Sequence, residues 1–407
     1  MTSHSSSLLR LLDERGYIHQ ATDAAALDAL AAREVVSGYI GFDATAPSLH
    51  VGSLVQIMML RRLQQAGHRP IVLMGGGTTK VGDPSGKDES RKLLSDADIQ
   101  ANIASIRSVF ERFLTFGDGP SDAILLDNAD WLDGLNYVDM LRTIGPHFTI
   151  NRMLTFDSVK LRLDREQPLT FLEFNYMILQ AYDFLELSRR AKCRLQLGGS
   201  DQWGNIINGI DLGRRIDGAE LFGVTTPLVT TADGAKMGKT AAGAVWLNAD
   251  QLSPYDYWQF WRNTADADVV KFLRLFTDIP VLEIALMAKF EGAELNQLKI
   301  RLANEATTML HGKAAASAAA ETARRTFEEG TTGDNLPTLG TGQTISVLAA
   351  LTGLGFCASN GEAKRKIAEG AVRIDDKVIT DPAYVIQVPN NPVKVSLGKK
   401  KHGLLIS

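Results

Sequence analysis

The sequence predicts an α/β fold, with a parallel sheet first, an all-helical region next and a small basic α+β module last. Two observations predict the sheet: short apolar runs alternate with helical stretches, and several of these runs end in glycine-rich loops. The third observation is a change in composition, because the chain turns helical from Ser253 and basic from about Thr341. With 407 residues, of which 45% are hydrophobic, the chain is long enough for two or three domains with sizeable cores.

The sheet begins at Val36–Phe42, a short apolar run that we expect to be a buried strand. A polar loop containing Pro47 follows, and His50-Val-Gly-Ser53 then leads into a helix with an apolar face from Leu54. A second strand is expected at Ile71–Met74, which completes a βαβ unit with parallel strands. The turn at His50 directs a helix N-terminus at a potential anion, although most turns of this kind only pack a helix against a sheet.

The remaining elements of this region extend the same pattern. Two short helices are expected within residues 8–34, and further strands at Ala123–Leu126 and Arg194–Leu197. Residues 171–182 have helical periodicity and almost no charge, so this helix should be buried. Leu228-Val-Thr230 is the last expected strand end and precedes a fourth glycine-containing loop. Because ligands bind parallel sheets at the carboxyl ends of the strands, these loops mark the expected site.

Charge and cysteine content narrow the class of protein. The net charge is −4, yet the segment from Thr341 to the end holds nine Lys/Arg against five Asp/Glu, which suggests an anionic partner for the tail. The two cysteines, Cys193 and Cys357, suit a reducing compartment without disulfides. No apolar run approaches the roughly 18 residues of a membrane helix, and the N-terminus lacks a signal peptide. We therefore expect a cytoplasmic protein.

The fourth loop carries two lysines, Lys236 and Lys239, together with Gly234 and Gly238. Lysines in a glycine-containing loop suit a cation clamp on a phosphate that is being transferred, where charge develops in the transition state. Taken alone, the loop is better explained as a solvated surface loop.

The loop and the His50 turn together resemble the HIGH and KMSKS signature sequences of class I aminoacyl-tRNA synthetases. Further blocks are similar, in order and spacing, to the bacterial tyrosyl-tRNA synthetases, and this resemblance covers nearly the whole chain. These blocks are Tyr39-Ile-Gly-Phe-Asp-Ala-Thr45, Gln64-Gln-Ala-Gly-His-Arg-Pro70, Gly82-Asp-Pro-Ser-Gly86, Tyr176-Met-Ile-Leu-Gln-Ala-Tyr-Asp183 and Gln196-Leu-Gly-Gly-Ser-Asp-Gln-Trp-Gly204. The resemblance implies that tyrosine and ATP give tyrosyl-adenylate and pyrophosphate, and that tyrosine then passes to the 3' end of tRNA(Tyr) in translation.

The resemblance also implies a domain plan. Residues 1–247 would form a Rossmann-like catalytic domain, with N-terminal helices and an insertion at about 127–165 that forms a homodimer interface. Residues 248–329 would be a helical anticodon-binding domain and 330–344 a linker. Residues 345–407 resemble the small RNA-binding fold named after ribosomal protein S four.

The resemblance assigns the tyrosine site. Tyr39 and Asp183 would hydrogen-bond the substrate phenol, which needs one donor and one acceptor. From the residues alone, Asp183 could instead form a buried ion pair with an arginine. Asp83, Tyr176 and Gln180 would surround the ammonium group; Tyr176 and Gln180 are four residues apart and so share a helix face. Gln202 would lie near the substrate carboxylate, and Gln196 would support the site from behind.

The nucleotide site follows from the same resemblance. The residues expected to bind ATP are Gly41, Asp43, Thr45, His50, Gly52, Ser53, Gly199, Asp201, Lys236 and Lys239. Those expected to act on the phosphates are His50, Thr45, Lys236, Lys239, Lys87 and Arg91. The substrate carboxylate attacks ATP itself, so positioning and electrostatics would supply the rate. Mg²⁺ would accompany ATP, and no metal bound by the protein alone is expected.

Two signature positions depart from the family pattern. Ser53 replaces the second histidine of HIGH, so we expect it to contribute less or to act through water. Gly238 replaces a serine of KMSKS, a change that is common among tyrosine enzymes.

In the tail, Ser359 should cap a helix that carries Lys364, Arg365 and Lys366, and Gly370 should end it. A basic helix face beside the strand Val372–Ile374 is typical of a surface that binds RNA phosphates. The alternative is a helix that is merely soluble.

Three other functions fit part of the sequence. A tryptophanyl-tRNA synthetase shares the fold but normally lacks the tail and the pair Tyr39 and Asp183. A small nucleotidyltransferase also uses an H-x-G-H turn, although such chains are far shorter. An RNA-binding protein that has lost catalysis is disfavoured by the intact lysines, Asp83 and Asp201.

Overall fold

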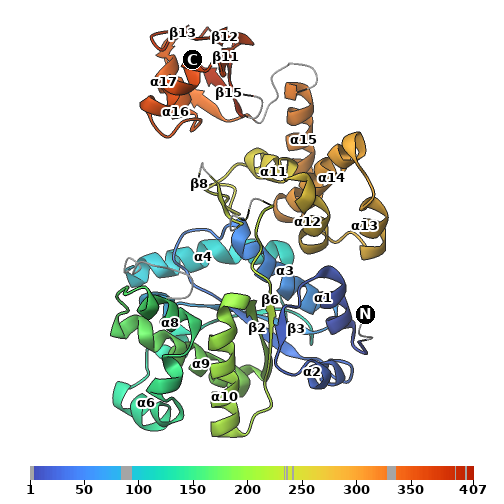
Figure 1. Ribbon diagram of the computed structural model, residues 1–407, viewed down its shortest axis with the longest axis vertical. Coiled ribbons are helices and arrows are strands. Elements are labelled where there is room, and N and C mark those ends of the chain that lie inside the picture. Colours follow the sequence, from blue (N-terminus) through green and yellow to red (C-terminus); the bar gives the residue numbers. More distant parts are fainter. Residues whose placement is uncertain are drawn as a thin grey trace. The chain divides into compact units, whose positions relative to one another are not determined.

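The computed structural model describes residues 4–83, 94–232, 234, 237–240, 243–327, 336–389, 391–398 and 401–407. The chain divides into two compact units. One consists of Met1–Met237 with Ala265–Phe290, and the other of Gly238–Thr264 with Glu291–Ser407 (Figure 1). No helix among the described residues is long and apolar enough to cross a membrane.

The first unit is built on a six-stranded sheet with the strand order β1-β6-β5-β2-β3-β4. The strands are β1 (Gln20–Ala21), β2 (Ser37–Phe42), β3 (Arg69–Met74), β4 (Ile124–Asp127), β5 (Cys193–Gly199) and β6 (Phe222–Thr226). From β6 to β4 neighbouring strands run parallel, which confirms the predicted parallel sheet. The edge strand β1 pairs antiparallel with β6 and is too short for a sequence pattern to reveal.

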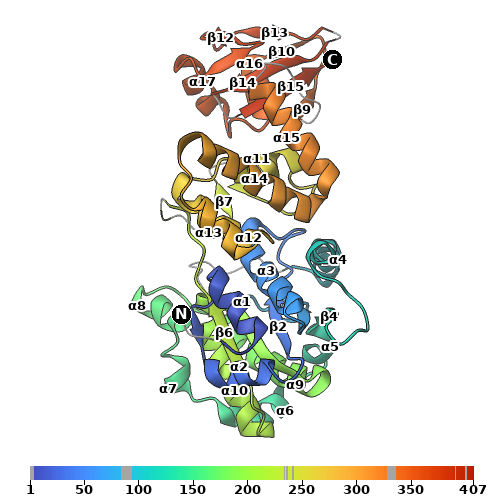
Figure 2. The ribbon, with the colours of Figure 1, turned by 90° about the vertical axis from the view of Figure 1, so that its right-hand side faces the viewer.

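Helices cover both faces of this sheet. On one face, α3 (Val51–Gln65) contacts β2, β3 and β5, and α1 (Ser7–Arg15) and α4 (Asp96–Phe113) contact α3. On the other, α9 (Phe171–Ala191) and α10 (Trp203–Asp217) pack against each other and on β5 (Figures 1 and 2). Helix α2 (Ala24–Ala31) contacts α1. The sheet is therefore buried on both sides, which explains its nearly continuous apolar strands.

Two boundaries differ from the sequence prediction. Helix α3 begins at Val51, not Leu54, because the His50 side chain caps the helix: its Nδ1 accepts from the backbone N–H of Gly52 at 3.0 Å. The last strand of the sheet ends at Thr226, before Leu228-Val-Thr230. Its sequence contains Gly223 and three threonine or valine residues, so it lacks the long apolar run that marked the other strands.

A helical insertion lies between β4 and α9. It contains α5 (Ala129–Leu132), α6 (Tyr137–Thr143), α7 (Ile150–Met153) and α8 (Asp157–Asp164). Its buried residues Met140, Ile144 and Met153 share a core with Met177 and Leu185 of α9. The insertion is fixed to the sheet domain through this core.

Residues 265–290 belong to the first unit, although the sequence grouped them with the helical region. They contain α12 (Val269–Phe276) and α13 (Val281–Met287). The segment following α12 is held by Asp278, which forms ion pairs with Arg61 at 2.5 Å and with Arg62, both on α3. Composition does not reveal a pairing between residues more than 200 positions apart.

The second unit contains a helical part and the C-terminal module. The helices are α11 (Pro254–Arg262), α14 (Gly292–His311) and α15 (Lys313–Phe327), and a short hairpin is formed by β7 (Lys239–Thr240) and β8 (Gly243–Ala244). Ser253 caps α11 by accepting from the backbone N–H of Asp256 at 3.1 Å, with Pro254 at the first helical position. This is the start that the sequence predicted.

The C-terminal module has its own core, formed by residues between 339 and 405. Its elements are α16 (Val347–Gly353), α17 (Asn360–Ala368), β9 (Thr338–Gly340), β10 (Thr344–Ser346), β11 (Val372–Ile374), β12 (Lys377–Ile379), β13 (Val385–Gln387), β14 (Val393–Leu397) and β15 (Lys401–Ile406). Strand β9 pairs in parallel with β15, so part of the expected linker belongs to the module, where Leu339 packs on the core.

Both cysteines of the sequence are free and buried. Cys193 begins β5, where burial raises the pKa of its thiol to about 12. Cys357 belongs to the core of the C-terminal module.

Candidate active site

The carboxyl ends of β2, β3, β4 and β5 bring together most of the residues that the sequence singled out. Asp43 follows β2, three glycines follow β3, and Gly199 ends β5. In a parallel sheet all these ends lie along one edge, where substrates bind.

The turn after β3 approaches its neighbours too closely for side chains. A Cβ on Gly75 would lie 2.6 Å from Oδ1 of Asp43, and one on Gly76 would lie 2.2 Å from Oδ1 of Asp127. The backbone N–H of Gly76 donates to that same oxygen at 2.9 Å, and Gly77 N–H donates to Oδ1 of Asn128 at 2.8 Å. Glycine is therefore required here so that the turn can bond to the end of β4.

The buried end of the site contains Asp183, whose side chain is almost fully buried. Its Oδ1 accepts from the indole Nε1 of Trp131 at 2.7 Å, and its Oδ2 accepts from Nδ2 of Asn128 at 2.9 Å. Both partners are neutral, so among the described residues this carboxylate is held by hydrogen bonds and not by the ion pair with arginine that the sequence left open. Burial raises the pKa of Asp183 to about 7; the hydrogen bonds from Asn128 and Trp131 act in the opposite direction.

Tyr39 reaches the same buried region from β2. Its side chain is 1% exposed, and its hydroxyl has no hydrogen-bond partner among the described residues. Burial and the nearby charge of Asp183 raise the pKa of this phenol well above its usual value. The ring packs edge-on against Phe184, with 5.2 Å between centroids. A buried hydroxyl and a buried carboxylate thus lie near each other with hydrogen-bonding capacity for a third polar group.

A second polar group of residues lies between α9, α10 and the turn after β3. Gln202 Nε2 donates to Oδ2 of Asp83 at 3.1 Å, and Gln180 Nε2 donates to Oε1 of Gln202 at 3.3 Å. Asn205 Nδ2 donates to both Oε1 of Gln180 at 3.0 Å and Oε1 of Gln202 at 3.1 Å. Tyr176, four residues before Gln180 on α9, is buried. The structure therefore joins Asp83, Gln180 and Gln202 into one network.

The expected nucleotide side lies at the start of α3. Because Nδ1 of His50 accepts from Gly52 N–H, a neutral imidazole carries its proton on Nε2. A Cβ on Gly52 would lie 2.7 Å from the carbonyl oxygen of Met237, so the two signature segments approach each other here. Asp43 accepts from Thr78 Oγ1 at 3.1 Å, while Gly41, Thr45 and Asp201 are exposed. Ser53 lies in the first turn of α3, partly exposed, and Gly199 is buried.

Four of the expected catalytic residues cannot be placed. Lys87, Arg91 and Lys236 lie outside the described residues, as does the side chain of Lys239, whose backbone is in β7. Their roles stay predictions.

In the C-terminal module, Lys364 and Arg365 are exposed on α17, whereas Lys366 forms an ion pair with Glu369 at 2.8 Å. Ser359 caps this helix, accepting from Glu362 N–H at 3.3 Å, and Gly370 follows its end with a φ of 69°. Both expectations for the helix ends are confirmed.

Sequence reasoning missed Asn128, Trp131 and Asn205. Asn128 and Trp131 follow the strand predicted at Ala123–Leu126, so polar and aromatic residues just after a strand end were the available signal. Asn205 is three residues after Gln202, on the first turn of α10, and carried no distinct pattern.

The profile of the family "tRNA synthetases class I (W and Y)" matches residues 31–328. The chain belongs to this family. The expectation of a class I aminoacyl-tRNA synthetase is thereby confirmed.

Relatives of this class I family match the full length. The chain is 67% identical to the tyrosine–tRNA ligase of Novosphingobium aromaticivorans, over 100% of this chain and 99% of the relative. It is 64% identical to that of Zymomonas mobilis, with the same coverage. A solved structure of a C-terminally truncated mitochondrial tyrosyl-tRNA synthetase from Coccidioides posadasii is 33% identical, with a TM-score of 0.67 over 77% of this chain and 91% of that one. This likeness confirms the Rossmann-like fold of class I synthetases.

Proposed function

We propose that this chain is a tyrosine–tRNA ligase of the bacterial type. It joins L-tyrosine to ATP, forming tyrosyl-adenylate and pyrophosphate, and then transfers tyrosine to the 3' end of tRNA(Tyr) for translation in the cytoplasm. The observation that carries the proposal is the pair Tyr39 and Asp183. The buried carboxylate of Asp183 accepts a hydrogen bond from the substrate phenol, and the buried hydroxyl of Tyr39 donates one to the phenol oxygen.

The polar network at Asp83 binds the other end of tyrosine. Asp83, Tyr176 and Gln180 surround the ammonium group, where the charge of Asp83 is the main attraction. Gln202 places the substrate carboxylate. An oxygen of this carboxylate attacks the α-phosphorus of ATP, the bond from this phosphorus to the bridging oxygen breaks, and pyrophosphate leaves. No side chain has to act as nucleophile, so catalysis rests on positioning and charge.

The start of α3 and the lysine loop bind ATP, which enters with Mg²⁺ as part of the substrate. His50 donates from Nε2 to a phosphate oxygen, since its Nδ1 is held by Gly52. Thr45 and Asp43 lie on the same side, and Asp201 binds the ribose beside Gly199. Lys236, Lys239, Lys87 and Arg91 neutralise the charge that moves to pyrophosphate; Gly41, Gly52 and Ser53 line the nucleotide.

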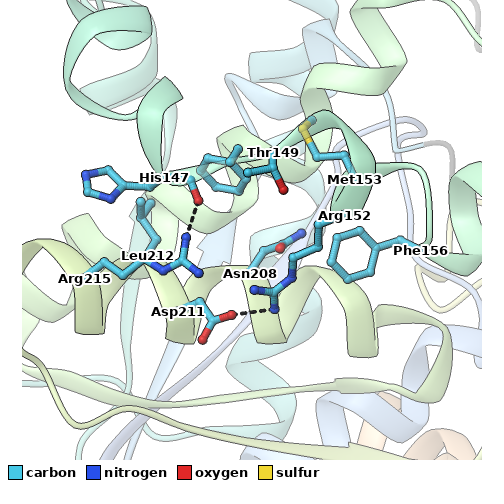
Figure 3. Close-up of a pocket in the computed structure, with 10 residues that line it drawn as sticks. His147, Thr149, Arg152, Met153, Phe156, Asn208, Asp211, Leu212 and Arg215 are labelled. Carbon is cyan, nitrogen blue, oxygen red and sulfur yellow. Dashed lines mark hydrogen bonds and ion pairs between the residues drawn. The ribbon is translucent and has the colours of Figure 1, made fainter.

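A homodimer is the assembly we propose, with the insertion at about 127–165 as its interface. This insertion and the start of α9 expose large apolar side chains. They are Tyr137, Val138, Leu141, Ile150, Leu154, Leu161, Leu163, Phe171 and Leu172. Such a concentration is typical of an interface. The insertion is held on α10 by the ion pair of Arg152 with Asp211 at 2.5 Å and by Arg215, which donates to the carbonyl of His147 at 2.6 Å (Figure 3).

The helical part and the tail bind tRNA. A groove of about 810 Å³ lies among α11, α14 and α15, lined by Trp258, Arg262, Asn304, Lys313 and Arg324 among others. Aromatic, amide and basic side chains are the groups that bind unpaired bases and phosphates, which favours an anticodon contact. Lys364, Arg365 and Lys366 on α17 contact phosphates elsewhere on tRNA.

The tryptophan enzyme is the second candidate, since the family profile covers both specificities. The indole of a tryptophan substrate has a hydrogen-bond donor but no acceptor oxygen, so the Tyr39 hydroxyl would be left without a partner. One assay separates the two: exchange of pyrophosphate into ATP, measured with each amino acid in turn. Tyrosine alone should support exchange. Exchange driven by tryptophan, or by no amino acid, would contradict the proposal.

Two substitutions test the residues named. Tyr39→Phe and Asp183→Asn should each reduce the preference for tyrosine over phenylalanine, because the phenol loses a partner. Unchanged selectivity in both variants would remove the pair from the specificity site.

A further inference from the structure

Helix α12 meets the start of the lysine loop, which we define as residues 231–240. Asp268, the residue before α12, is 3% exposed, and its Oδ2 accepts from the backbone N–H of Ala232 at 2.7 Å. Lys271, one turn into the helix, donates from Nζ to the carbonyl of Thr230 at 2.7 Å. The same Nζ pairs with Oδ1 of Asp268 at 2.7 Å. A buried carboxylate and a lysine thus hold three consecutive residues at the entry of the loop.

The carboxylate of Asp268 forms its hydrogen bond with the loop and not with the backbone of its own helix. An aspartate at the N-cap position normally accepts from a backbone N–H of the first helical turn. Here the Asp268 side chain makes no such capping hydrogen bond. Its two oxygens bond to Ala232 and Lys271 instead. The interaction therefore serves the position of the loop entry, not the formation of α12.

The other end of α12 is fixed to the helices around the sheet. Arg15 of α1 donates from Nη1 to the carbonyl oxygens of Arg274 and Thr277, both at 2.9 Å. Arg62 of α3 donates to the carbonyl of Thr277 at 2.6 Å. These cations satisfy carbonyl groups at and after the helix C-terminus, which otherwise lack partners. The helix is therefore a fixed support for whatever bonds to its N-terminal end.

The loop also approaches the start of α3. The backbone N–H of Met237 donates to the carbonyl of Val229 at 3.0 Å, so Val229 and Met237 lie side by side. The carbonyl of Met237 lies so near Gly52 that a Cβ there would be 2.7 Å away. The place where the loop starts is thus set both by α12 and by the turn that carries His50.

We propose that Asp268 is a positioning residue for tyrosine activation. With Lys271, it fixes Thr230–Ala232 so that the loop bearing Lys236 and Lys239 departs from one defined point beside α3. The inference rests on the proposed function, since it gives those lysines their part in moving negative charge to pyrophosphate. Electrostatic stabilisation depends on donors that are already in place. A shift of the residues where the loop begins should therefore slow the formation of tyrosyl-adenylate without weakening the binding of tyrosine.

The test uses full-length Asp268→Ala and Lys271→Met, with Asp266→Ala as the control. Asp266 belongs to the same 3-10 turn and carries the same charge, but its side chain is exposed. The rate of tyrosyl-adenylate formation at saturating substrates should fall about 10- to 100-fold in both test variants. The dissociation constant for tyrosine should stay unchanged. The double variant should be no slower than the slower single variant, because both substitutions break the same contact of Asp268 and Lys271 with Thr230–Ala232.

Asp268→Asn supplies the conservative comparison. It keeps an oxygen for Ala232 N–H but loses the charge that holds Lys271, so its rate should lie between those of wild type and Asp268→Ala. The inference is overturned if Asp268→Ala and Lys271→Met form adenylate as fast as wild type. It is also overturned if tyrosine affinity falls as much as the rate. Lys271→Met decides the matter should Asp268→Ala not fold. A wild-type protein without tyrosine-dependent exchange would instead refute the proposed function.

Discussion

The indole of Trp131 donates a hydrogen bond of 2.7 Å to the carboxylate of Asp183 at the buried end of the site. Trp131→Phe keeps an aromatic ring and removes this donor. The ionised form of Asp183 then loses a hydrogen bond to a charged group, worth about 1.5–3 kcal/mol. We expect weaker tyrosine binding at neutral pH and a higher pKa for Asp183. Fluorescence titrations measure the binding of both amino acids. Phenylalanine binding is the control and should change little. Equal losses for both ligands would mean that the ring only supports packing.

Tyrosine affinity should depend on pH through Asp183. Burial raises the pKa of this carboxyl to about 7. Only its ionised form can accept a hydrogen bond from the substrate phenol as well as those from Asn128 and Trp131. The dissociation constant should be flat above this pH and rise below it, by about tenfold per pH unit. Titrations between pH 5.5 and pH 8.5 test this. Asp183→Asn should give a flat profile, and a wild-type profile equally flat would contradict the assignment.

The same pKa has a consequence for folding. A carboxyl whose pKa is higher in the folded state than in the unfolded chain binds more protons when folded. Between its ordinary value of 3.8 and about 7, the contribution of Asp183 to stability therefore decreases as pH rises. Binding of tyrosine should release the proton of Asp183 in this pH window. Isothermal calorimetry in buffers of different ionisation enthalpy would detect this release.

Lys236→Ala and Lys239→Ala should slow adenylate formation and leave tyrosine affinity nearly unchanged. The reason is that a cation near the phosphates acts mainly when charge moves to pyrophosphate. Rapid-quench rates and equilibrium binding separate the two quantities. Normal rates with poor tyrosine binding would show that these lysines have another role.

Removing the C-terminal module should separate the two half-reactions. Its hydrophobic core consists of its own residues, so a chain ending after Phe327 should keep pyrophosphate exchange. Charging of tRNA should fall sharply, and the salt dependence of tRNA binding should become shallower because phosphate contacts are lost. Both activities are compared with those of the full chain. Equal charging by the two forms would exclude the module from tRNA binding.

Asp278→Asn should lower stability at neutral pH. Asp278 pairs with Arg61 and Arg62, and Arg62 is completely buried. Burial opposes ionisation of Asp278, but the hydrogen bond from Arg61 and the charges of Arg62 and Arg61 hold its pKa well below the usual value. The Asp278 side chain is 36% exposed, so we expect a loss of about 1–3 kcal/mol. Thermal unfolding measures it, with Asp266→Ala as the control. A depressed pKa means that the contribution is present above pH 3.8 and is lost as pH falls below it.

Local pattern was enough to predict the sheet and the buried helix that carries Gln180 and Asp183. Strand β2 is an apolar run that contains glycine, β3 is one that glycine follows, and β5 is one that ends in glycine. Gln180 and Asp183 lie on a helix with clear periodicity. Trp131 was missed because α5 has four residues and is too short for any period. The place of residues 265–290 was missed because it depends on Asp278 meeting Arg61 and Arg62, a pairing that no local pattern encodes. Strand β9 was missed because three residues in a Gly/Thr-rich stretch look like linker.

Two buried thiols make this chain a suitable background for site-directed labelling. Maleimides and methanethiosulfonates attack thiolates that they can reach, and Cys193 and Cys357 are both buried. A cysteine introduced at the exposed Ala104 of α4 would therefore take up a nitroxide selectively. With one nitroxide per subunit, a two-fold dimer in frozen solution gives the dipolar modulation of one inter-spin distance, and a monomer gives none.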